Sequence, residues 1–171
     1  FCSVGPVPGK AMAQFLPDVR VESLIYGVAD VAESGGRQAD GNKVCFTAIG
    51  YIEARKGQDI LVQAVQQLPG DVRERAVFYL VGQNTSRMAG EIREIIEDIP
   101  EIVMTGTMGR KEIFGMLART DVLVCPSRED PMPTVAAEAM MCRVPCLVSD
   151  ATGTASYIEP EENGMVFPSG D

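Results

Sequence analysis

The sequence predicts an α/β domain built on an open, mostly parallel β-sheet. From residue 44 onward, short apolar runs that end near glycine or proline alternate with longer segments of helical pattern. Parallel strands need crossover connections, and helices at this spacing supply them. The 171 residues are ample for one such domain with a real core and too few for two full ones.

The individual elements follow from where the apolar runs start and stop. Residues 1–4 and 21–26 are expected to be strands around a short helix at 9–15, and the polar, glycine-rich segment 30–43 is typical of a mobile linker or loop. Further strands are expected at 44–49, 76–81, 101–105, 122–125 and 145–148, with a final turn and strand in 163–168. Helices are expected at 58–67, 85–98, 110–118, after Pro133, and at 152–158. In such sheets ligands bind where the strands end, so the loops at that edge are the candidate site.

Composition excludes several classes of function. Hydrophobic residues make up 46% of the chain and charged residues 23%, as in ordinary globular proteins. The net charge of −9 argues against general nucleic-acid binding, and no apolar run is long enough to span a bilayer. We also see no signal peptide. Because the chain has no histidine, Ser-His-Asp or Cys-His catalysis and histidine-ligated zinc are excluded for this segment alone.

The five cysteines predict a reducing compartment. They are odd in number, lie mostly in apolar runs and form no C-x-x-C pair. We therefore expect reduced core residues in a cytoplasmic protein, without a disulfide or a metal.

The stretch 121–150 (DVLVCPSREDPMPTVAAEAMMCRVPCLVSD) holds the most informative carboxylates. Glu138 is the only charge between Asp130 and Arg143, in a run whose apolar character predicts a buried helix. A buried carboxylate needs compensation, either from a backbone amide or a cation such as Arg143, or from ligand hydroxyls. Asp130 before Pro131 is open to two interpretations as well, a helix N-cap or a ligand contact.

The segment PSREDPMPTVAAEAM resembles the signature of the retaining glycosyltransferases of the GT-B fold, glycosyltransferase family 4 (group 1). In that signature an acidic residue, seven others and a Glu precede an Ala-Met pair, which here selects Asp130 and Glu138. The sequence departs from the signature in having Asp130 for Glu, with Glu129 one residue earlier, and prolines where the family has glycines. The resemblance implies a Rossmann-like open parallel sheet with helices on both faces, the carboxyl-terminal half of a GT-B fold.

A second matching region is GYIEARKGQDILVQA, residues 50–64. Lys56 and Gly57 follow the first strand of the domain and start a helix, so a cation and free amides are expected at the sheet edge, a combination that suits a diphosphate. The family usually has Arg at the position of Tyr51, and Arg55 is the nearest candidate to replace it. Because prolines lack amide hydrogens, we expect Lys56 and Arg55 to contribute more to phosphate binding than the loop backbone does.

The other roles are those that the resemblance implies. Glu138 is expected to accept hydrogen bonds from ribose hydroxyls, and Asp130, assisted by Glu129, to approach the donor sugar as the catalytic carboxylate alongside Lys56. Expected to complete the donor site are Gly50 and Gly82, which leave room at strand ends, Thr107 and Met108, which line the base, and Met132 and Thr134 in the signature loop and helix.

The resemblance also sets the expected organisation and partners. Residues 1–40 would be the end of an acceptor domain and the interdomain hinge, and 41–171 a donor-binding domain, in a chain truncated at both ends and inactive alone. The donor would be a nucleoside-diphosphate sugar, with no cofactor or obligatory metal, and the acceptor a glycan or lipid-linked molecule held by the other domain. We expect a cytoplasmic protein, with association at the inner face of the membrane an open alternative.

Other classes of function remain open alternatives. A dinucleotide-dependent oxidoreductase would need G-x-G-x-x-G after the first strand, where this chain has Gly50 followed by Tyr51, Ile52 and Glu53. A noncatalytic α/β interaction module would explain the fold but not Lys56 and the two carboxylates at matching strand ends.

Overall fold

The computed structural model describes residues 2–4, 6–24, 27–28 and 41–170. A small amino-terminal unit comprises strand β1 (Cys2–Val4), helix α1 (Pro6–Phe15) and strand β2 (Glu22–Leu24), with the strands paired in parallel. The expected strand–helix–strand order is confirmed, and the helix starts earlier than residue 9. Residues 30–40 of the predicted linker lie outside the described part of the chain.

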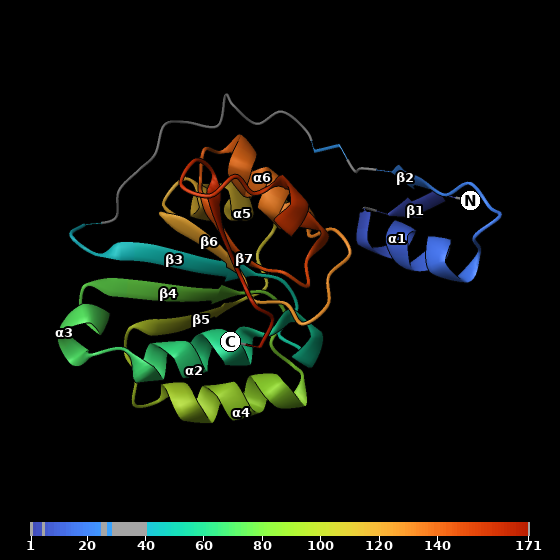
Figure 1. Cartoon of the computed structure of the whole chain (residues 1–171). Coiled ribbons are helices and arrows are strands. Elements are labelled where there is room, and N and C mark those ends of the chain that lie inside the picture. Colours follow the sequence, from blue (N-terminus) through green and yellow to red (C-terminus); the bar gives the residue numbers. More distant parts are fainter. Residues whose placement is uncertain (1, 5, 25–26, 29–40, 171) are drawn as a thin grey trace.

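The main body is a six-stranded sheet with the order β5-β4-β3-β6-β7-β8, in which every neighbouring pair is parallel (Figure 1). This confirms the fold class expected from the alternating pattern. The strands are β3 (Val44–Ile49), β4 (Ala76–Val81), β5 (Ile102–Gly106), β6 (Val122–Cys125), β7 (Cys146–Ser149) and β8 (Gly164–Phe167).

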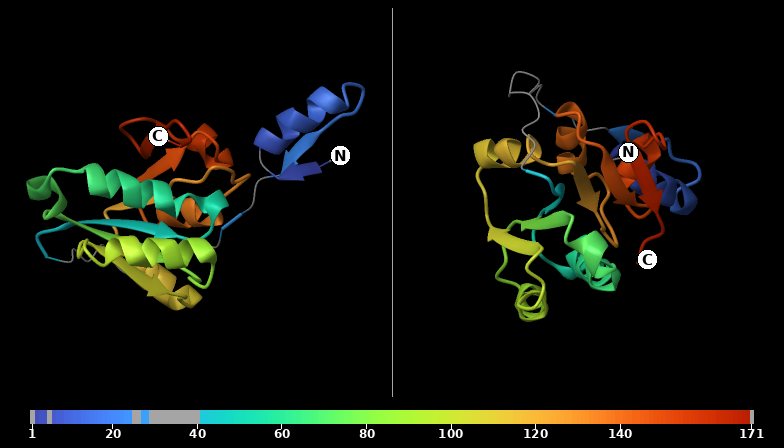
Figure 2. Two further views of the ribbon diagram at one scale, coloured as in Figure 1. Left: turned by 90° about the horizontal axis from the view of Figure 1, so that it is seen from below. Right: turned by 90° about the vertical axis from the view of Figure 1, so that its left-hand side faces the viewer.

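Helices cover both faces of this sheet. Helices α2 and α4 lie on one face and α5 and α6 on the other, as the views in Figures 1 and 2 agree. The helices are η1 (Ala54–Lys56), α2 (Gln58–Gln67), α3 (Gly70–Arg73), α4 (Arg87–Ile96), α5 (Arg110–Leu117), α6 (Thr134–Met141) and η2 (Gly153–Tyr157). Within the described residues, no helix combines the length and apolar character that a membrane crossing requires.

Differences from the expected boundaries have local causes. Helix α4 starts later than residue 85 because Ser86 caps it, its hydroxyl accepting a hydrogen bond from the amide of Ala89 at 3.0 Å. The segment expected as a helix at 152–158 is a 3₁₀ helix.

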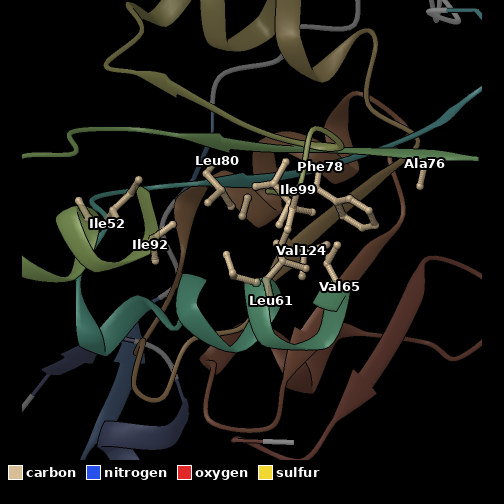
Figure 3. Packing of buried hydrophobic residues seen from close by; sticks show 13 residues of the cluster. Ile52, Leu61, Val65, Ala76, Phe78, Leu80, Ile92, Ile99 and Val124 are labelled. Atoms are coloured by element: carbon tan, nitrogen blue, oxygen red, sulfur yellow. The ribbon is translucent and has the colours of Figure 1, made fainter. Parts of the chain in front are cut away.

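The core has one layer on each face of the sheet. Between the sheet and helices α2 and α4, Phe78, Leu80, Leu61 and Ile92 pack together (Figure 3). Burying each of these side chains is worth about 1.5–3 kcal/mol. Under α5 and α6 the second layer contains Leu117, Leu123, Ala136, Ala139 and Val148.

Helix α6 is less buried than its composition predicts. Ala136 and Ala139 are fully enclosed, whereas Thr134 and Met141 at the two ends are exposed. Only the alanine face packs on the sheet, so the expectation of a helix buried on nearly all sides is wrong. The small side chains of Ala136 and Ala139 let the helix lie close to the sheet.

The connections reverse direction between β3 and β6. From β3 the chain proceeds outward to β4 and β5, then returns to β6 and proceeds the other way to β7 and β8. The loops that follow β3 and β6 therefore leave neighbouring strands and diverge, which opens a crevice at the carboxyl edge of the sheet.

Candidate active site

A lysine and an aspartate from the two diverging loops meet at this edge. Lys56 Nζ lies 2.5 Å from Asp130 Oδ2, and their side chains are 20% and 7% exposed, respectively. The pair joins positions 74 residues apart in the sequence. Charge-assisted hydrogen bonds of this length between partly buried groups are strong.

Gly57 allows the two loops to approach one another. It has φ +69°, where it ends η1 and begins α2, and a Cβ placed on it would lie 1.9 Å from the carbonyl oxygen of Pro126. Any other residue would combine an unfavourable backbone conformation with a collision against backbone. The glycine thus fixes how closely the β3 loop packs on the β6 loop.

Asp130 is not a helix cap. Its amide donates to the carbonyl of Ala151 at 3.2 Å, and its carbonyl accepts from the amide of Gly153 at 2.9 Å, so the loop is held in an extended bridge. Helix α6 begins only at Thr134, with Pro133 as its N-cap residue. A residue before proline avoids the helical conformation, and both Asp130 and Met132 precede prolines, which delays the helix. The N-cap interpretation is therefore wrong, and the Asp130 amide is already engaged.

Glu138 is compensated by a cation from a different helix. Its side chain is 15% exposed, and Arg110 Nη2 at the start of α5 lies 3.5 Å from Oε1. The Arg110 guanidinium also lies 5.3 Å from the centre of the Phe114 ring, which it covers. Arg143, the partner expected from sequence proximity, instead follows the end of α6 with φ +61°.

The crevice contains a hollow lined by side chains from both loops. Its rim and walls include Lys56, Gln58, Ser127, Asp130, Pro133 and Val135, over a floor of Ala48, Ile49, Val124, Cys125 and Pro126. Burial raises the pKa of the Cys125 thiol, so this floor is uncharged. Glu138 lies one helical turn beyond Val135 on α6 and is not among the lining residues. The structure thus brings Lys56 and Asp130 together and places Glu138 in a separate pair with Arg110.

Arg55 and Glu129 lie outside the hollow. The Arg55 guanidinium donates to the carbonyl of Glu129 at 3.2 Å and pairs with the Glu53 carboxylate at 3.0 Å. Glu129 and Tyr51 are exposed. The guanidinium expected to contact phosphate is therefore engaged with the protein in this state.

The two glycines predicted at strand ends, Gly50 and Gly82, lie where two segments of backbone approach closely. A Cβ on Gly82 would lie 1.9 Å from the carbonyl oxygen of Gly50, so β4 and the β3 loop touch directly. A Cβ placed on Gly50 would lie 3.8 Å from the Lys56 side chain, an ordinary van der Waals contact, so Lys56 passes close to Gly50 but its space does not require a glycine there.

The remaining predicted residues lie in two other places, the loop after β5 and the segment that leads into α6. Thr107 is exposed and Met108 half-buried between β5 and α5, Met132 is half-buried in the β6 loop, and Thr134 is exposed at the start of α6. None of these four lines the hollow.

Sequence reasoning missed Gln58, Ser127 and Arg110. Gln58 is buried and its amide donates to the carbonyl of Tyr51 at 2.8 Å, which holds the β3 loop. Its position beside Lys56-Gly57 was a usable signal. Arg110 had none, because no local pattern pairs it with a glutamate on another helix.

The architecture defines an α/β domain, and the cation–carboxylate pair marks a candidate ligand site at the switch point of its sheet. Residues 42–171 match the family model described as "Glycosyl transferases group 1". The chain belongs to this glycosyltransferase family, which confirms the resemblance at the level of group 1.

Characterised relatives agree with this assignment. The chain is 26% identical to an alpha-D-kanosaminyltransferase of Streptomyces kanamyceticus, a match that covers 90% of this chain and 42% of that protein. It is also 26% identical to the lipopolysaccharide glucosyltransferase WaaG of Escherichia coli, over 70% of this chain and 31% of that one. The chain therefore spans less than half the length of these relatives.

Solved structures share the fold. The crystal structure of WaaG superposes with a TM-score of 0.80 at 20% identity, covering 99% of this chain and 49% of that one. HepE from Anabaena, solved in complex with UDP and glucose, gives a TM-score of 0.82 at 19% identity over 99% of this chain and 49% of that one. These likenesses confirm the Rossmann-like α/β fold.

Proposed function

We propose that this chain is the donor-binding domain of a retaining glycosyltransferase that uses a nucleoside-diphosphate sugar. The observation that carries the proposal is the contact between Lys56 and Asp130 at the topological switch point, in the segments that match the family's motifs. The structure of HepE with UDP-glucose supports a nucleotide sugar as the class of ligand.

Lys56 would stabilise the departing diphosphate. When the bond between the anomeric carbon and the phosphate oxygen breaks, negative charge grows on that oxygen, and a preorganised ammonium group lowers the energy of this state. In a retaining reaction the new bond from the anomeric carbon to the acceptor oxygen forms on the same face of the sugar, and the proton of the acceptor hydroxyl passes to the departing diphosphate oxygen. Lys56 is suitable for this role because Gly57 lets its loop pack closely on the β6 loop and Asp130 holds its ammonium group.

The carboxylates would divide the contacts to the donor. Asp130 faces the hollow beside Lys56 and is the candidate to approach the sugar, with the exposed Glu129 assisting it. Glu138 would accept hydrogen bonds from the ribose hydroxyls, exchanging its long contact with Arg110 for them. Thr107, Met108, Met132 and Thr134 would contact the base and the sugar of the donor.

The acceptor would bind outside the described sheet. We propose a glycan or lipid-linked acceptor held by a second domain, with residues 1–40 contributing the hinge. A cytoplasmic location, where nucleotide sugars are made, accords with this proposal. WaaG, described as acting in lipopolysaccharide biosynthesis, is a relative of this kind.

Titration calorimetry tests the proposal. UDP, GDP and ADP, and then the sugar forms of whichever binds, should produce saturable heat, and Lys56→Ala should weaken that binding by about tenfold or more, since a charge-assisted phosphate contact is lost. Unchanged affinity in Lys56→Ala would contradict the assignment of the phosphate site. Binding of nicotinamide dinucleotides alone would favour an oxidoreductase, and the absence of any response would favour an interaction module.

A further inference from the structure

Two arginines cross between the loops that carry Lys56 and Asp130. Arg55 of the β3 loop donates from Nη1 to the carbonyl of Glu129 at 3.2 Å. Arg128 of the β6 loop donates from Nη1 to the carbonyl of Ala54 at 2.8 Å. Each arginine thus belongs to one loop and binds the backbone of the other.

Arg128 extends this connection to helix α2. Its Nη1 and Nη2 lie 2.8 and 2.6 Å from the two carboxylate oxygens of Asp59, in the first turn of that helix. Burial opposes ionisation of Asp59, but the hydrogen bond and charge of Arg128 outweigh it and hold the pKa of the Asp59 carboxyl below its ordinary value. Exposed ion pairs usually contribute little stability, whereas a bidentate ion pair also fixes the orientation of the guanidinium.

The backbone reinforces the same register. The amides of Arg128 and Glu129 both donate to the carbonyl of Arg55, at 2.8 and 3.3 Å. Lys56 directly follows Arg55, and Asp130 directly follows Glu129. A slip of one loop past the other would therefore move the lysine ammonium relative to the carboxylate.

We propose that Arg55, Arg128 and Asp59 form a loop clamp that positions Lys56 and Asp130 for the donor. None of the three lines the hollow, so they are positioning residues that act through Lys56. The clamp also assigns Arg55 to holding the loops rather than to contacting phosphate. This inference rests on the proposed function, because the geometry it preserves is that of a diphosphate site.

A double-mutant cycle in the intact protein tests the clamp. The variants are Arg128→Ala, Lys56→Ala and the two combined, titrated with whichever of UDP, GDP or ADP the wild type binds. Arg128→Ala should weaken binding by about fivefold, and the double variant should bind little worse than Lys56→Ala, because coupled residues are non-additive. Arg128→Lys keeps the positive charge but loses the bidentate guanidinium contact. Its nucleotide affinity should therefore fall between those of wild type and Arg128→Ala.

Arg87→Ala is the matched control. It removes an arginine–carboxylate pair of 2.8 Å with Glu91 on the exposed surface of α4, and should leave nucleotide affinity unchanged. Amide hydrogen exchange without ligand supplies a second readout: Arg128→Ala should speed exchange in residues 53–57 and 126–130, and Arg87→Ala should not.

The clamp proposal would be overturned if the affinity losses of Arg128→Ala and Lys56→Ala multiplied in the double variant. It would also be overturned if amide hydrogen exchange in both loops were unchanged in Arg128→Ala. If the wild type binds no nucleoside diphosphate, the proposed function fails instead. The exchange comparison then decides by itself whether Arg128 holds the loops together.

Discussion

Asp130 would have two opposing effects on the diphosphate proposed to bind here. In the structure it neutralises Lys56 and holds its ammonium group in place, yet the same carboxylate would repel the anion that we propose Lys56 binds. A site that keeps this carboxylate loses ground-state affinity, which is the pattern expected when the group serves the reaction rather than binding.

Asp130→Asn should therefore tighten nucleoside-diphosphate binding while abolishing sugar transfer. The amide oxygen can still accept a hydrogen bond from Lys56 but leaves the positive charge available, so affinity should rise by about threefold to tenfold. Calorimetry with UDP, GDP and ADP measures the affinity, and product formation by the intact protein measures transfer. Glu94→Gln, on the exposed surface of α4, is the control and should change neither affinity nor transfer. Weaker binding by Asp130→Asn would show that the carboxylate serves to orient Lys56 above all.

The stability that Asp59 contributes to the fold depends on pH. Its pKa in the folded protein lies below the ordinary 3.8, so the folded state favours the ionised form. The stability it contributes is fully present above the unfolded-state pKa and disappears as pH falls through the folded one.

Asp59→Asn should accordingly destabilise the protein near neutral pH, by about 1 kcal/mol or less for a partly exposed pair. The difference from wild type should shrink below about pH 4 as the wild-type carboxyl protonates. Urea unfolding at pH 7 and pH 3 measures both values. A difference that is equal at the two pH values would mean that the ion pair with Arg128 contributes nothing.

At the scale of elements, close approach between loops depends on glycine. A Cβ placed on Gly57 would lie 1.9 Å from the carbonyl oxygen of Pro126, and a Cβ placed on Gly153 would lie 1.8 Å from that of Pro131. These contacts bind η1 and η2 to the β6 loop from opposite sides. The segment carrying Asp130 is consequently fixed by backbone as well as by side chains.

Gly57→Ala should lower the free energy of unfolding by about 2 kcal/mol or more, since it combines a left-handed conformation with a backbone collision. Gly115→Ala in the interior of α5 is the matched control: nothing lies within 4 Å of its Cβ position, and alanine there should stabilise by about 0.5–1 kcal/mol. Denaturant titration of both variants measures the contrast. Equal effects would show that the β3 loop shifts freely to admit a side chain.

Elements were more predictable than the contacts between them. The helix at 58–67 and the strands at 44–49, 76–81 and 122–125 match the sequence expectation to the residue, because glycine, proline and apolar periodicity act locally. The partner of Glu138 does not match the sequence expectation, because Arg110 approaches from a separate helix, whereas Arg143 is close to Glu138 only in sequence. The carboxylates could be selected from sequence, but their neighbours depend on how α5 and α6 pack.

At the scale of the whole molecule, burial sorts the cysteines. All five are free: Cys45, Cys125 and Cys146 are buried, Cys142 is half-buried and Cys2 is exposed. The expected position in the core is confirmed for the three buried residues and is wrong for Cys2. Burial raises the pKa of the Cys146 thiol to about 12, which leaves almost no reactive thiolate at neutral pH.

A thiol reagent at pH 8 should therefore modify Cys2 first and Cys125 and Cys146 only on unfolding. Mass spectrometry of partially labelled protein, with a urea-unfolded sample as the control, measures the order. Labelling of Cys125 as fast as Cys2 would indicate that the floor of the hollow opens to solvent.

The pairing of β3 with β6 brings together segments that are far apart in the sequence. Lys56 and Asp130 come together when β6 pairs with β3, and β4, β5 and α5 lie in the chain between them. Contacts of such long range close late and slowly during folding. Recognition of a diphosphate by this protein would thus report that assembly is complete, and a nucleotide present during refolding would favour the last step over the earlier ones.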